Sequence, residues 1–92
     1  MVQAVENWAW LTGRIASLHQ MDKHLELEVE VMTTTPIAGY PDLLAQYAGN
    51  RVRIRIAEPP ALSAGQTVIL KARLAGPGLV WGAADSLVIQ PR

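Results

Sequence analysis

Two tryptophans near the start of the chain are the residues best suited to binding chemistry. Trp8 and Trp10 lie two positions apart, so in a strand both side chains point to one face, which Arg14 continues. Leu11 and Ile15 fall on the opposite face, which directs the two indoles to solvent. Aromatic rings beside cations stack nucleic-acid bases, and exposed Trp with Arg is equally typical of protein–protein hot spots.

Two cations of a later segment, Lys71 and Arg73, also share one strand face. If the strand that carries them pairs with the first strand, both lie close to the indoles. The predicted ligand- or partner-binding residues are therefore Trp8, Trp10, Arg14, Lys71 and Arg73. The alternative is structural: the two indoles fold back over one end of the protein as part of its core.

Residues for catalysis or metal binding form no known arrangement. The serines Ser17, Ser63 and Ser86 belong to no nucleophile motif, and the sequence contains no phosphate-binding glycine loop. His19 and His24 flank a predicted hairpin turn at a spacing that matches no standard metal site. We therefore expect no enzymatic activity, no cofactor and no metal.

Charged residues alternate with apolar ones in two segments. The first segment is acidic, with Glu26, Glu28 and Glu30, and the second is basic, with Arg51, Arg53 and Arg55. If these two strands pair antiparallel, the charges become cross-strand ion pairs. A solvated lattice of this kind contributes ~0–1 kcal/mol per pair. The alternative, an arginine strip for phosphates, is less favoured because the carboxylates cancel the attracting field.

Composition limits the class of protein. The chain has 92 residues, 50% of them apolar and 17% charged, which is enough for the core of one small domain. Eight basic residues balance eight acidic ones, which argues against a dedicated duplex-DNA binder. The first residues lack the basic start of a signal peptide, and no apolar run reaches the ~20 residues of a membrane span. We expect a cytoplasmic protein with no membrane partner.

Apolar residues recur at every second position, which predicts five strands. The pattern is clearest at 24–32 and 50–56, and the other strands are predicted at 8–18, 67–74 and 79–90. Gly13 predicts a bulge or bend in the 8–18 strand, and Gly82 a break in the last one. The predicted core consists of Leu25, Leu27, Val29, Val52, Ile54, Val68 and Leu70.

One short helix is predicted at 41–48. Pro41 suits a first helical turn, Asp42 suits a helix N-terminus and Gly49 suits the position just past the end. Between them, Leu43, Leu44 and Tyr47 lie at helical spacing and would pack on the sheet.

Five strands with a glycine-bent first strand favour a closed antiparallel barrel. The segments TGRIASL, GNRVRIRI and GQTVILKARL resemble the strands and turns of oligonucleotide/oligosaccharide-binding (OB) proteins, in which a bent first strand serves both sheets. OB proteins usually place their helix between strands three and four, whereas the helical pattern here falls between strands two and three. The prediction is a single mainly-β OB-like domain over residues 1–92, with an SH3-like barrel as the alternative.

Two functions remain open at this point. One is a non-catalytic protein-interaction or assembly module, whose partner is another protein or a second copy of the chain. The other is a single-stranded nucleic-acid binder, which the OB resemblance implies. The zero net charge favours the interaction module, because phosphate neutralisation dominates affinity for nucleic acid.

Overall fold

The computed structural model describes residues 6–57 and 61–90 of the chain. Its regular elements are six strands and two single 3₁₀ turns: β1 (Ala9–Gln20), β2 (Leu25–Pro36), η1 (Ala45–Tyr47), β3 (Arg51–Ile56), β4 (Thr67–Gly76), β5 (Leu79–Gly82), η2 (Ala84–Ser86) and β6 (Val88–Ile89). Within these described ranges no helix is long and apolar enough to cross a membrane.

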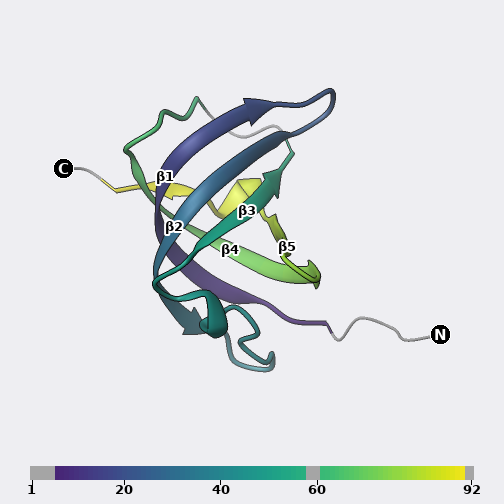
Figure 1. Ribbon diagram of the computed structural model, residues 1–92. Coiled ribbons are helices and arrows are strands. Elements are labelled where there is room, and N and C mark those ends of the chain that lie inside the picture. The colour runs from purple at the N-terminus through teal and green to yellow at the C-terminus, as the bar shows by residue number, and fades with distance from the viewer. Residues whose placement is uncertain (1–5, 58–60, 91–92) are drawn as a thin grey trace.

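The strands close into a barrel. Their hydrogen-bonded order is β1-β2-β3-β5-β4, and a further pairing of β1 with β4 joins the two ends (Figure 1). The short β6 pairs with β4 outside this ring, at Val68 and Ile69. The predicted five-stranded barrel is therefore confirmed. The prediction of a purely antiparallel sheet is wrong, because Arg53–Ile56 of β3 pairs in parallel with Leu79–Gly82 of β5.

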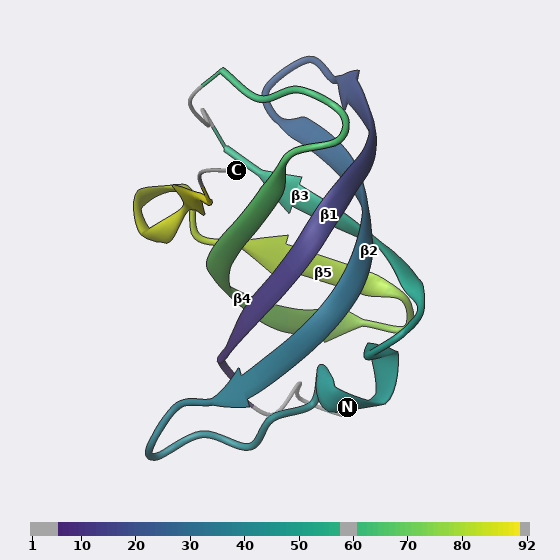
Figure 2. The ribbon, with the colours of Figure 1, turned by 90° about the vertical axis from the view of Figure 1, so that its left-hand side faces the viewer.

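Strand β1 holds the barrel together by pairing on both sides. It lies diagonally between β2 and β4 (Figure 2), along β2 for its full length and along β4 from Ala9 to Arg14. Its register against β2 shifts at Thr12/Gly13, as the sequence predicted for Gly13. A side chain at Gly13 would meet Val29 and come within 2.8 Å of the Glu30 carbonyl oxygen, so this close approach requires glycine.

The core fills the barrel interior from all five strands. All seven predicted core residues are buried, and Leu11, Ile15, Ile56 and Val80 join them with no more than 1% of their surface exposed. A barrel of this size is filled by its own side chains. Binding sites must therefore lie on its outer surface.

The predicted helix at 41–48 is wrong, since only the 3₁₀ turn η1 forms there. Asp42 does cap the segment, but its Oδ1 accepts the backbone N–H groups of Leu44 and Ala45 and so closes a local turn. Gly49 then takes a φ of 83° and its N–H donates to the Val31 carbonyl, which ends the turn after Tyr47. So few residues cannot offset the cost of helix nucleation, and only Leu44 is buried deeply.

The last predicted strand is broken at Gly82, as expected. A side chain at Gly82 would lie 2.6 Å from the Leu70 side chain and 3.0 Å from that of Ile56, so β5 can pack against the core only through a glycine. The chain then leaves the barrel as η2 and returns as β6.

Candidate functional site

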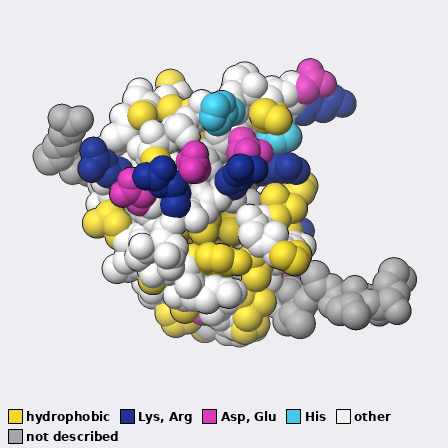
Figure 3. Space-filling view, viewed as in Figure 1, with side chains coloured by type: hydrophobic (Ala, Val, Ile, Leu, Met, Phe, Trp, Pro, Cys, Tyr) yellow, Lys and Arg dark blue, Asp and Glu magenta, His cyan; other side chains and the backbone are white. Residues whose placement is uncertain are grey.

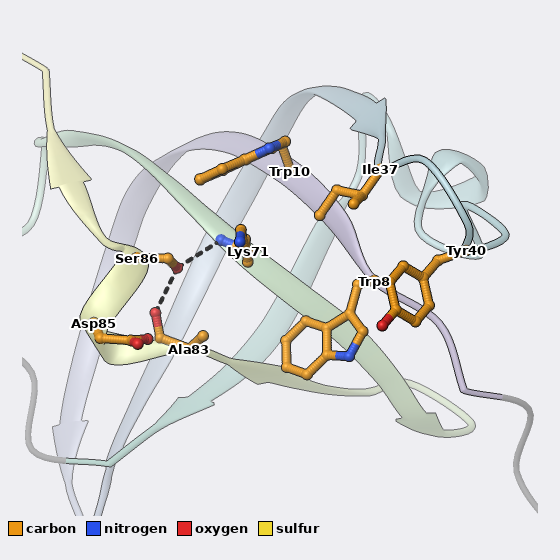
Figure 4. Close-up of a pocket in the computed structure, with 8 residues that line it drawn as sticks. All are labelled: Trp8, Trp10, Ile37, Tyr40, Lys71, Ala83, Asp85 and Ser86. Atoms are coloured by element: carbon orange, nitrogen blue, oxygen red, sulfur yellow. Dashed lines mark hydrogen bonds between the residues drawn. The ribbon is translucent and has the colours of Figure 1, made fainter.

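A groove of about 470 Å³ lies on the outer surface where the start of β1, the loop after β2, β4 and η2 meet (Figure 4). We call it the aromatic groove. Its lining residues are Trp8, Trp10, Ile37, Tyr40, Lys71, Ala83, Asp85 and Ser86. Three of the five predicted site residues, Trp8, Trp10 and Lys71, therefore come together in one place.

The first strand places the two indoles. Ala9 and Leu11 face the core, so Trp8 and Trp10 face outward and are half-buried. The Asn7 side chain anchors the segment before them: its Nδ2 donates to the Leu74 carbonyl at 3.0 Å, and its Oδ1 accepts the Leu74 N–H at 2.8 Å. This buried amide continues the β1–β4 pairing past Ala9, which fixes the start of the groove.

Lys71 lies at the centre of the groove, with the two indoles on either side of it in Figure 4. It is directly opposite Trp10 in the β1–β4 register, and its Nζ lies 5.3 Å from the centre of a Trp10 ring. This is a cation–π contact, in which the ring quadrupole attracts the ammonium. One face of Trp10 is thereby occupied by the protein's own cation.

The turn η2 forms the wall of the groove opposite Trp8 and Tyr40 (Figure 4), and hydrogen bonds join it to the backbone of β4. The Lys71 N–H donates to Ser86 Oγ at 2.8 Å, the Ala83 N–H donates to the Lys71 carbonyl at 2.9 Å, and Ser86 Oγ donates to the Ala83 carbonyl at 2.6 Å. The Ser86 hydroxyl is thus committed to structure. Asp85, carried on the same turn, is exposed at the edge of the groove.

The loop after β2 supplies Ile37 and Tyr40, which sequence reasoning did not assign to the site. A turn brings them together: the Tyr40 N–H donates to the Ile37 carbonyl at 3.1 Å, and Gly39 takes a φ of 91°. The signal available in the sequence was this Gly39 beside an aromatic residue, since glycine is favoured at positive φ in turns.

The two remaining predicted residues do not line the aromatic groove. Arg14 is exposed further along β1, opposite Glu30 on β2 and Thr67 on β4. Arg73 lies two residues beyond Lys71 on the same face of β4, where it is opposite Trp81 of β5. The expected single strip of two indoles and three cations is therefore divided.

The alternating charges form the predicted antiparallel lattice on the outer face of β2 and β3. Glu26, Glu28 and Glu30 lie opposite Arg55, Arg53 and Arg51 in register. Figure 3 shows a band of alternating acidic and basic side chains across this face. Three contacts join them: Arg51 to Glu30 at 3.1 Å and to Glu28 at 3.8 Å, and Arg55 to Glu26 at 3.5 Å.

The described part of the chain contains no group of three or more His, Cys, Asp or Glu side chains that could hold a metal ion. Searches of protein families, of curated proteins and of solved structures each find no match to this chain.

Proposed function

We propose that this barrel is a non-catalytic interaction module that binds an extended, mostly uncharged segment of another protein in the aromatic groove. The observation that carries the proposal is the convergence of three aromatic side chains and Ile37 on one groove of about 470 Å³, from two segments, the start of β1 and the loop after β2. Tryptophan and tyrosine in a concave site are the residues that dominate protein–protein binding energy.

The charge of the groove supports a protein partner over a nucleic acid. Lys71 and Asp85, its charged lining residues within the described chain, balance each other. Lys71 also occupies one face of Trp10, where a base would otherwise stack. Single-strand binders instead combine free aromatic faces with a basic channel.

A non-catalytic role agrees with the chemistry of the lining. The one hydroxyl nucleophile on the η2 wall, that of Ser86, donates to the Ala83 carbonyl and accepts the Lys71 N–H. No imidazole or thiol is among the described lining residues to activate a nucleophile.

For the fold, we propose an OB-like rather than an SH3-like barrel. The support is the long β1, which is bent at Gly13 and pairs with both β2 and β4. The departure from the usual OB pattern is that residues 61–66, in the described part of the connection from β3 to β4, contain no helix.

The test compares Trp10→Ala with the unmodified protein in binding to a purified partner obtained by affinity capture, and in self-association measured by light scattering. Loss of a hot-spot indole should weaken the complex by about 2 kcal/mol, or roughly 30-fold in Kd. Met32→Ala is the matched control, because Met32 is 57% exposed and outside the groove. Equal affinity of Trp10→Ala and the unmodified protein for every partner would contradict the proposal.

The second candidate function, single-stranded nucleic-acid binding, is favoured by the OB-like topology and by the number of aromatic residues. It predicts that single-stranded oligonucleotide quenches Trp fluorescence, with an affinity that falls steeply as salt rises and weakens with Trp8→Ala or Trp10→Ala. The interaction module predicts that neither change affects oligonucleotide binding.

A further inference from the structure

Trp81 lies outside the aromatic groove and is flanked by two arginines. It is 46% exposed on the outer face of β5. In register it is opposite Arg55 on the parallel neighbour β3 and opposite Arg73 on the antiparallel neighbour β4. Across the antiparallel β4–β5 pair, directly opposite side chains are about 4.5–5.5 Å apart at Cβ. The parallel neighbour β3 lies one strand spacing away, about 4.7–4.9 Å. Arg55 and Arg73 therefore flank Trp81 on its two neighbouring strands.

A pocket of about 280 Å³ adjoins this indole. Lys23 and His24 from the β1–β2 turn, Arg55, Ile56 and Ala57 from the end of β3, and Trp81 and Gly82 from β5 line it. No acidic side chain is among the described lining residues. The pocket therefore presents an apolar floor, an aromatic face and basic groups around its edge.

The cations here are less neutralised than Arg51 of the charge lattice. Arg51 has two carboxylates within 4.0 Å, whereas Lys23 and Arg73 have none among the residues that the structure describes. Arg55 is paired with Glu26 through its buried Nε at 3.5 Å, while its side chain as a whole stays 41% exposed. A ligand with a negative charge would gain contacts that the protein itself does not make.

We propose that Trp81, Arg55, Arg73 and Lys23 form a binding site for a ligand that joins a flat heteroaromatic ring to a phosphate, which is the chemistry of a nucleotide. The ring stacks on the Trp81 indole, and the phosphate accepts hydrogen bonds from the flanking guanidinium groups and the Lys23 ammonium. A ring alone would contact only the indole, and a phosphate alone would contact only the cations. This site is independent of the proposed partner groove, although Lys71 and Arg73 make the two surfaces neighbours along β4.

The experiment follows the three indole N–H signals of the ¹⁵N-labelled protein, assigned by single Trp→Phe variants. The probes are thymidine 5′-monophosphate, thymidine, inorganic phosphate and an oligothymidylate of about eight nucleotides. We expect the monophosphate to shift the Trp81 signal first and to bind more tightly than thymidine or phosphate. Similar affinities for monophosphate and oligothymidylate would identify a free nucleotide as the ligand, and at least tenfold tighter binding of the oligomer would identify a single strand.

Variants then test the named residues. Trp81→Ala should weaken binding by about 5- to 150-fold, the range for loss of one base–aromatic stack, while Trp81→Phe should retain most of it. Arg73→Gln should weaken oligothymidylate binding and lower its salt slope by about 0.7. Arg14→Gln removes the same charge at the opposite end of β4, next to Thr67, and should leave the affinity within twofold.

Three results would overturn this site. The first is a Trp81 signal that does not move at millimolar monophosphate. The second is movement of the Trp8 and Trp10 signals in place of it. The third is a folded Trp81→Ala variant, with an otherwise unchanged amide spectrum, that binds the probes as the unmodified protein does.

Discussion

At the scale of single residues, Asn7 is the polar side chain on which the aromatic groove depends. It is 1% exposed, and its amide exchanges two hydrogen bonds with the backbone of Leu74, as a strand residue would. Because it directly precedes Trp8, it decides where the first indole lies.

Asn7→Ala should therefore destabilise the protein by about 1–3 kcal/mol, since it leaves the Leu74 N–H and carbonyl without these partners. Urea unfolding measures the change in the free energy of unfolding. The Trp8 indole N–H signal should also move, because the segment loses its anchor. Gln20→Ala is a suitable comparison, as its amide bonds are exposed, and it should stay within about 0.5 kcal/mol. A variant Asn7→Ala as stable as the unmodified protein would show that this anchor contributes nothing.

Substitutions at Arg53 and Glu28 test the charge lattice, because these two residues are directly opposite in the β2–β3 register. Arg53→Glu places carboxylates side by side, and adding Glu28→Arg restores opposite charges. The double-mutant cycle should show a coupling of about 0.5 kcal/mol that shrinks in high salt. Arg53→Glu combined with Asp22→Arg, in the turn beyond the paired strands, should be additive. Additivity in the first pair as well would mean that the two side chains do not interact.

At the scale of elements, the bend in β1 depends on the absence of a side chain at Gly13. Gly13→Ala should lower the free energy of unfolding by about 1–3 kcal/mol, because its methyl group would press on Val29 and on the Glu30 carbonyl. Gly76→Ala is the matched control, since open space surrounds that position and its φ is not in the left-handed range. Thermal unfolding compares the two variants. Equal loss of stability in both would refute the close approach at Gly13.

The sequence was most informative where a side-chain pattern determines which residues face each other. The alternating glutamates and arginines predicted the β2–β3 register, and the period-two apolar residues predicted the core. The parallel pairing of β3 with β5 could not be predicted in the same way. This pairing joins segments that are far apart in sequence, and no residue of a local turn indicates which strand becomes the neighbour of β5.

The candidate site was predictable on the strands and not beyond them. Trp8, Trp10 and Lys71 follow from strand faces, so their meeting depended only on the β1–β4 pairing. Tyr40, Asp85 and Ser86 come from irregular segments without periodicity, where position is set by hydrogen bonds such as that between the Lys71 N–H and Ser86. Trp81 falls within the last predicted strand, but its position between Arg55 and Arg73 required knowledge of both neighbouring strands.

At the scale of the whole molecule, a net charge of zero conceals an uneven surface. The outer face of β2 and β3 cancels its own charges, the aromatic groove balances Lys71 against Asp85, and the pocket beside Trp81 is basic. Steering by long-range charge is therefore weak, and recognition must come from short-range contacts with the indoles.

The proposed function requires another protein to occupy the aromatic groove. The most direct measurement is the set of amide and indole signals that shift when the purified partner is titrated into ¹⁵N-labelled protein. We expect shifts at Trp8, Trp10, Tyr40 and the Ala84–Ser86 turn, and unchanged signals from the β2–β3 lattice face. Shifts confined to that lattice face, with the groove signals unmoved at saturation, would contradict it.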